Sequence, residues 1–113
     1  MEKNCNTNFK YLQDALDMIG TKWRVQILFS ICVEHNTHFR EIERSIEGLS
    51  TRMLSRELKI MEQIGLVTRI VKSTMPVEII YNETELTHTL VPVFDALLEW
   101  GEIYSDKANN STK

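Results

Sequence analysis

Two short amphipathic segments meet at a glycine in the middle of the chain, and this arrangement limits the fold more than any other feature. In 39–47 the apolar residues recur at helical spacing. Gly48 ends this segment, because glycine admits the backbone angles of a sharp reversal. Ser50 is a favourable N-cap for a second helix, which we expect to end at Gly65. The inward stripe of that second helix is predicted to comprise Leu54, Leu58 and Met61.

Two runs rich in β-branched residues follow, at 66–72 and 77–81. The residues between them, 73–76, predict a short exposed tip in which Pro76 holds Met75 extended. A helix, a glycine turn, a second helix and a two-stranded ribbon are typical of a winged helix-turn-helix. The sequence therefore predicts a mainly α fold with a small β-hairpin wing.

Three further helical patterns flank this unit. Segment 9–19 has one apolar stripe, whereas 22–32, capped by Thr21, is apolar on most of its circumference. The latter is expected to be the buried central helix. A long pattern starts at Thr84, and Pro92 inside it should kink the helix or mark a restart.

The composition suits one globular domain: 113 residues, 42% hydrophobic and 26% charged. We expect a flexible segment at 1–8, a single domain with its dimerisation helices at 9–107, and a flexible tail at 108–113. No apolar stretch approaches the roughly 18–20 residues that cross a bilayer, and the N-terminus shows no secretion signal. Two cysteines make no disulfide framework, so we expect a cytoplasmic protein without a membrane partner.

Charge is distributed unevenly. Between Thr37 and Lys72, seven basic residues face five acidic ones, a net charge of +2, although the whole chain carries −3. Between Glu83 and Asp106 there are six acidic residues and no Lys or Arg. The middle of the chain can therefore present a local positive face, which a nucleic-acid partner requires.

The second helix of a helix-turn-helix enters the DNA major groove with its early residues toward the bases. If the leucines face inward, a set of polar and basic residues projects outward. Arginine offers a planar fork of donors that suits guanine edges or phosphate. An ordinary solvated face with Arg–Glu pairing is the alternative, but 51–56 contains no acid. The predicted DNA-binding residues of this helix are Ser50, Thr51, Arg52, Ser55, Arg56 and Lys59.

At the hairpin tip, Lys72, Ser73 and Thr74 are predicted to touch flanking DNA backbone, although turn tips are polar in most proteins. The alternation of the strand leaves open which face Arg69 takes.

Six segments in the right order resemble the HxlR-type winged helix-turn-helix transcriptional regulators, from about Ala15 to Gly101. The resemblance implies double-stranded operator DNA as a partner and a homodimer joined through the first and last helices. The segments are Gly20-Thr21-Lys22-Trp23, His38-Phe39-Arg40-Glu41-Ile42, Gly48 to Leu58, Gly65-Leu66-Val67-Thr68-Arg69, Pro76 to Tyr81 and Trp100-Gly101.

The chain departs from the family pattern in several places. Thr21 stands where the family usually has a second glycine. After the second strand, Glu83-Thr84 and Thr87 replace the usual Leu-Thr pair and later glycine. Some relatives sense oxidants through an N-terminal cysteine followed by proline, but Asn6 follows Cys5 here.

The last helical pattern carries more apolar surface than one small core needs, which favours a dimer over packing within one chain. A two-fold pair would space its recognition helices about 34 Å apart, one turn of DNA. The predicted dimer residues are Phe9, Leu12 and Leu16 of the first helix and Phe94, Leu97, Leu98, Gly101 and Tyr104 of the last.

Cysteine and histidine chemistry contributes little. Cys5 is a weak candidate for a redox thiol, and an incidental cysteine is the favoured interpretation. Cys32 is expected to pack in the core. The run from Cys32 to His38 superficially resembles a metal cluster but lacks a ligand set that zinc would need. His88 is expected to be solvated. No metal, cofactor or enzyme motif is predicted.

The sequence thus predicts a homodimeric, sequence-specific DNA-binding transcriptional regulator. Two alternatives stay open: a redox- or small-molecule-sensing regulator gated through Cys5 or the dimer helices, and a winged-helix protein-interaction module without DNA binding. The operator, the target genes, the effector and the sign of regulation are not encoded in any recognisable pattern.

Overall fold

The computed structural model describes residues 5–111, and the predicted fold class is confirmed: a winged helix-turn-helix, mainly α with one hairpin. The elements in chain order are α1 (Cys5–Ile19), α2 (Lys22–Cys32), α3 (Phe39–Ser45), α4 (Thr51–Gln63), β1 (Val67–Lys72), β2 (Glu78–Glu83), α5 (Glu85–His88) and α6 (Val91–Ser111).

Local signals place most of the helix ends. The Ser50 hydroxyl accepts a hydrogen bond from Met53 N at 3.1 Å, so the predicted cap of α4 is confirmed. Gly48 and Gly65 both have φ near +83°, a conformation that glycine adopts without strain. The turn between α3 and α4 and the end of α4 are thereby fixed.

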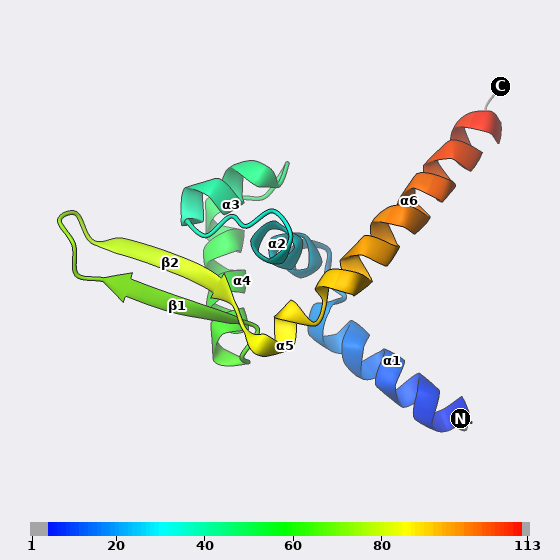
Figure 1. The fold of residues 1–113 in the computed structure, drawn as a ribbon, viewed down its shortest axis with the longest axis horizontal. Coiled ribbons are helices and arrows are strands. Elements are labelled where there is room, and N and C mark those ends of the chain that lie inside the picture. The colour runs from blue at the N-terminus through cyan, green and yellow to red at the C-terminus, as the bar shows by residue number, and fades with distance from the viewer. Residues whose placement is uncertain (1–4, 112–113) are drawn as a thin grey trace.

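The core surrounds α2, which Figure 1 shows at the centre of the molecule. As predicted, α2 is buried and Cys32 packs in the core. Phe94 of α6 is 3% exposed and meets Phe29 of α2 edge-on, with ring centroids 5.5 Å apart. The buried apolar residues are Ile27, Leu28, Ile31, Cys32, Ile42, Ile46, Leu49, Leu54, Leu58, Met61, Leu66, Val67 and Phe94.

The hairpin projects from one side of this core (Figure 1). Its strands pair antiparallel from Val67 opposite Glu83 to Lys72 opposite Glu78. The second strand thus runs to Glu83, two residues beyond the expected 77–81. Tyr81 N donates to Thr37 O at 2.7 Å and ties the hairpin to the segment before α3.

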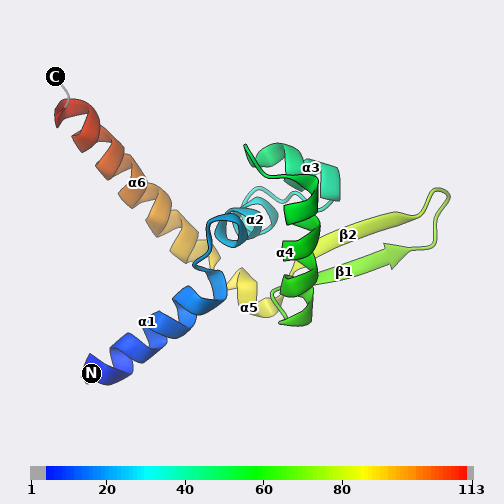
Figure 2. The same ribbon diagram turned by 180° about the vertical axis from the view of Figure 1, so that it is seen from behind.

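On the opposite side, α1 and α6 extend as two diverging arms (Figures 1 and 2). Helix α1 begins at Cys5, four residues before the helical pattern predicted from residue 9. Helix α6 likewise continues past residue 107 to Ser111. Neither 5–8 nor 108–111 contains a glycine or proline that would end a helix.

Pro92 marks a restart, as predicted. The short α5, capped by Thr84 through a 3.3 Å hydrogen bond from Thr87 N, ends at His88, and α6 begins at Val91. Pro92 therefore lies in the first turn of α6, where its missing N–H costs no helical hydrogen bond. No helix in the described range is long and apolar enough to cross a membrane.

Candidate nucleic-acid interface

Helix α4 presents a basic face away from the core. Its inner stripe, Leu54, Leu58 and Met61, is at most 1% exposed, which turns the other side of the helix outward. Thr51, Arg52, Ser55, Arg56 and Lys59 are all exposed, as predicted. Within residues 5–111, neither Arg52, Arg56 nor Lys59 forms an ion pair. The cations of this face are therefore free to meet an anionic partner.

A partly buried ion pair fixes α4 against α2. Arg24 Nε lies 3.0 Å from Glu57 Oε1, and the two side chains are only 12% and 13% exposed. Arg24 also donates from Nη1 to Met18 O at 2.9 Å, so one guanidinium joins the end of α1, α2 and α4. Sequence reasoning missed this pair, because its members are 33 positions apart.

The first residue of α4 is engaged within the protein. The Thr51 hydroxyl donates to Glu43 Oε2, and Arg40 Nη1 lies 2.9 Å from the other oxygen of the same carboxylate. These hydrogen bonds, that of Thr51 first, lower the pKa of Glu43. Thr51 therefore ties α4 to α3 as well as lying on the exposed face where DNA contact was predicted.

The hairpin tip is exposed throughout. Lys72, Ser73 and Thr74 all face solvent, and Met75 is 98% exposed. The Thr74 hydroxyl donates to Pro76 O at 2.7 Å across the tip, and the Met75–Pro76 peptide bond is cis. The predicted phosphate-contacting residues are thus brought to the outer end of the wing.

The tip end of the hairpin, where β2 begins, is joined to the helix-turn-helix by a charged cluster. His38 Nε2 lies 2.6 Å from Glu78 Oε2, and His38 Nδ1 lies 3.5 Å from Glu41 Oε1. The hydrogen bond to Glu78 raises the pKa of His38, and the same bond lowers the pKa of Glu78. Lys72, opposite Glu78 in the sheet, also favours the ionised form of that carboxylate.

This cluster predicts a pH-dependent contribution to stability. Because the pKa of His38 is raised on folding, the pair stabilises the fold below the ordinary histidine value of 6.5 and loses this effect as pH rises through the raised pKa. At the acid end it weakens once pH falls through the lowered pKa of Glu78. We expect His38→Asn to lower the urea midpoint at about pH 6 and to leave it nearly unchanged at about pH 9.

The double variant His38→Asn/Glu78→Gln serves as the control. It should show the same pH profile as His38→Asn, because each change alone removes the pair. An equal loss for His38→Asn at both pH values would show that His38 acts through packing and not through its charge.

The structure answers which face Arg69 takes. Arg69 lies with Tyr81, Lys59, Ser55 and Glu62 around a cavity of about 340 Å³ between the hairpin and α4. Arg69 therefore belongs to the hairpin face that is turned toward the recognition helix, next to two of the predicted DNA-binding residues.

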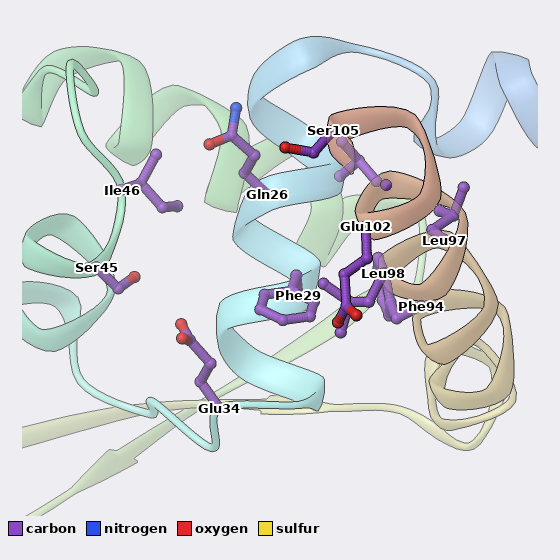
Figure 3. Close-up of a pocket in the computed structure, with 12 residues that line it drawn as sticks. Gln26, Phe29, Glu34, Ser45, Ile46, Phe94, Leu97, Leu98, Glu102 and Ser105 are labelled. Carbon is purple, nitrogen blue, oxygen red and sulfur yellow. The ribbon is translucent and has the colours of Figure 1, made fainter. Parts of the chain in front are cut away.

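The predicted dimer residues fall into three groups. Phe9, Leu12 and Leu16 on α1 and Tyr104 on α6 are between 52% and 68% exposed. Phe94 is a correction: its burial against Phe29 places it in the core of one chain, so it is not part of an exposed dimer face. Leu97, Leu98 and Gly101 line a cavity of about 540 Å³ between α6, α2 and the turn after α3 (Figure 3).

The apolar surface predicted on α6 extends beyond the predicted dimer residues. Trp100 stacks on Tyr104 with ring centroids 5.7 Å apart, and both side chains are more than 60% exposed. Val93 and Ile103 are also exposed on this arm. Ile103 was not part of the predicted apolar stripe, although its helical spacing from Trp100 and Tyr104 could have identified it.

The cysteines and histidines of the described residues form neither a reactive thiol nor a cluster of metal ligands. Burial raises the pKa of the Cys32 thiol to about 12, and the Glu83 carboxylate adds to the shift, so Cys32 stays protonated and unreactive. Cys5 starts α1, but its side chain lies outside the described part. His88 is not isolated: Nδ1 lies 2.8 Å from Glu83 Oε1. No group of three potential metal ligands occurs among the described residues.

Comparison with known proteins agrees with this geometry. A family model described as HxlR-like helix-turn-helix matches residues 18–109. A transcriptional regulator of the HTH type from Methanothermobacter thermautotrophicus is 36% identical over 97 residues, which cover 86% of this chain and 73% of the relative. YodB of Bacillus subtilis, also an HTH-type transcriptional regulator, is 29% identical over 101 residues, 89% of each chain.

Solved structures give the same result. The reduced form of the B. subtilis regulator YodB superposes with a TM-score of 0.69 and 30% identity, covering 81% of this chain and 89% of that one. The redox regulator HypR in its reduced form superposes with a TM-score of 0.75 and 33% identity, covering 88% and 97%. The chain therefore belongs to the HxlR-like helix-turn-helix family and is a DNA-binding transcriptional regulator.

Proposed function

We propose that this regulator binds operator DNA as a homodimer, with α4 of each subunit in a major groove. The observation that carries the proposal is the unpaired basic face of α4, on which Arg52 and Arg56 read or clamp the groove. Ser50, Thr51, Ser55 and Lys59 position the helix, and Lys72, Ser73 and Thr74 at the wing tip meet flanking phosphates. Regulation then follows from occlusion or recruitment at a promoter, without a catalytic step.

The arms support the dimer. Helices α1 and α6 point away from the side that bears the hairpin, and both carry exposed apolar residues (Figure 2). Phe9, Leu12 and Leu16 on α1 would pair with Leu97 and its neighbours on α6 of a second copy. Burial of these side chains at about 25 cal/mol per Å² of apolar surface would drive the association. A two-fold dimer would space the two α4 helices by about one turn of DNA.

A thiol-sensing version of this function has one observation in its favour, the structural likeness to the redox regulator HypR. In this chain such a role would fall to Cys5, because Cys32 is buried with its pKa raised to about 12. Release of DNA on mild oxidation, abolished in Cys5→Ser, would support it. Unchanged DNA binding under the same treatment would contradict it.

The proposed function is tested by selecting sites for the purified chain from a random duplex library. We expect an inverted repeat whose half-sites are about 10 bp apart, bound by two chains per duplex. Affinity for a duplex of about 30 bp carrying the selected site should fall steeply between about 50 and 200 mM KCl, because the contacts to phosphate release counterions. Fluorescence anisotropy measures the affinity, and sedimentation gives the stoichiometry.

Two outcomes would contradict the proposal. Failure to enrich any duplex would favour a protein-interaction module over a DNA-binding regulator. Enrichment of a single half-site, with one chain per duplex, would agree with DNA recognition by α4. It would contradict the proposal that the protein binds as a homodimer.

A further inference from the structure

The cavity between α4 and the base of the hairpin combines side chains from three elements. Ser55, Lys59 and Glu62 come from α4, Arg69 comes from β1 and Tyr81 from β2. In Figure 2, α4 lies across the base of the hairpin. The residues that line the cavity come from these two parts of the fold. We name these five residues the α4–wing niche.

The fold dictates which side chains meet here. Arg69 is directly opposite Tyr81 in the sheet, and residues opposite one another in an antiparallel pair share a face. Val67, two positions before Arg69 and hence on the same face, is buried at 2% exposure against the core. Ser55 and Lys59 are one helical turn apart on α4. The niche is therefore a fixed junction between the recognition helix and the wing.

Charge gives the niche its chemistry. Lys59 and Arg69 face one carboxylate, Glu62, so the niche carries a formal charge of +1. Both cations are exposed, and neither forms an ion pair within residues 5–111. By contrast, Arg24 and Arg40 lie within 3.0 Å of carboxylate oxygens. Two unpaired cations held together, with two hydroxyl groups beside them, form a site for a polar anion.

We propose that the α4–wing niche binds one phosphodiester of the duplex backbone, with Arg69 and Lys59 as the two cationic partners. This inference rests on the proposed function. The donor set fits phosphate: a planar guanidinium for two oxygens, an ammonium as a point charge, and the Ser55 and Tyr81 hydroxyls as further donors. Ser55 and Lys59 of the niche lie on the same exposed face of α4 as Arg52. The DNA strand that borders the major groove would pass along this face.

Such a contact makes Arg69 a positioning residue. A phosphate held between helix and wing sets how deep α4 lies in the groove and carries no sequence information. Arg69 was absent from the predicted DNA-binding residues, because its orientation depends on the pairing with Tyr81 and on the packing of β1 against α4.

The test compares Arg69→Gln and Lys59→Gln with Lys10→Gln, which removes an equal charge from the exposed arm α1. Each protein is titrated with the selected duplex and with a scrambled duplex between about 50 and 200 mM KCl. Each homodimer carries two niches, so each variant removes two phosphate contacts. At about 0.1 M salt this should weaken both affinities roughly 60-fold, about eightfold per niche, and reduce the salt slope by about 2. The ratio between the two duplexes should stay constant, and Lys10→Gln should behave as wild type.

Two further measurements show that the phosphate is shared. The Arg69→Gln/Lys59→Gln double variant should lose less affinity than the product of the single effects, because both cations serve one anion. A methylphosphonate group is then placed at single positions of the duplex backbone. Substitution at one position in each half-site should weaken binding of the wild type and cause Arg69→Gln no further loss of affinity. The thermal midpoint of Arg69→Gln should match the wild type, since Arg69 is exposed and without an ion pair.

The outcomes separate this inference from the function beneath it. If Arg69→Gln leaves both affinities and the salt slope unchanged while Arg52→Ala weakens binding, the niche assignment is wrong and the proposed function stands. If Arg69→Gln weakens only the selected duplex, Arg69 contacts a base and the phosphate assignment is wrong. If the wild type binds neither duplex, the proposed function itself fails.

Discussion

Replacing Glu57 by alanine should lower the free energy of unfolding by about 2–3 kcal/mol. Removing one partner of a fully buried ion pair costs about 3–5 kcal/mol, because the other charge is left without compensation. Here 12% and 13% of the two side chains remain exposed, and Arg24 keeps its 2.9 Å hydrogen bond to Met18 O. Both features reduce the loss below the fully buried value. Urea unfolding monitored by circular dichroism measures the effect.

Glu62→Ala is the matched control, since Glu62 lies on the same helix, is exposed and forms no ion pair with a described residue. It should change stability by less than about 0.5 kcal/mol. The double variant Arg24→Met/Glu57→Leu should recover most of the loss, because apolar groups of similar volume can replace a buried pair. A Glu57→Ala protein as stable as Glu62→Ala would show that the pair is solvated in solution.

The elements that the sequence predicts correctly are those with local causes. The Ser50 cap, the φ of +83° at Gly48 and Gly65, and the restart around Pro92 each depend on residues within one turn of the chain. The exposed face of α4 follows in turn from the 3.6-residue period of its buried stripe. The exposure of the individual side chains on α4 was accordingly predictable from the sequence.

The features that sequence reasoning missed depend on contacts between distant segments. Arg24 and Glu57 are 33 positions apart, and His38 and Glu78 are 40 apart. The spacing of an apolar stripe on a helix does not show whether the stripe packs against the core of its own chain or against a second copy. The prediction that Phe94 lies in the dimer interface is wrong for this reason, because Phe94 packs on Phe29 of the same chain. Helices α1 and α6 also extend further from the core than predicted, because residues 5–8 and 108–111 contain no helix breaker.

Arg52→Ala should weaken binding to the selected duplex by about 1–3 kcal/mol per subunit, the range for an arginine that makes two hydrogen bonds to one guanine. The side chain is exposed near the start of α4, where a recognition helix meets base edges, and the structure gives it no ion pair among residues 5–111. Arg56, one turn later on the same face, should show a loss of the same order. Fluorescence anisotropy at fixed salt, with selected and scrambled duplexes, measures both.

The ratio of the two losses identifies what each arginine contacts. A base contact lowers affinity for the selected duplex far more than for the scrambled one, whereas a phosphate contact lowers both equally. We expect the first behaviour for Arg52 and the second for Arg69, two arginines that the fold places on neighbouring exposed surfaces. If Arg52→Ala lowers the affinity for both duplexes equally, Arg52 contacts the DNA backbone and not a base. Sequence discrimination would then have to come from Arg56 or from the deformability of the operator itself.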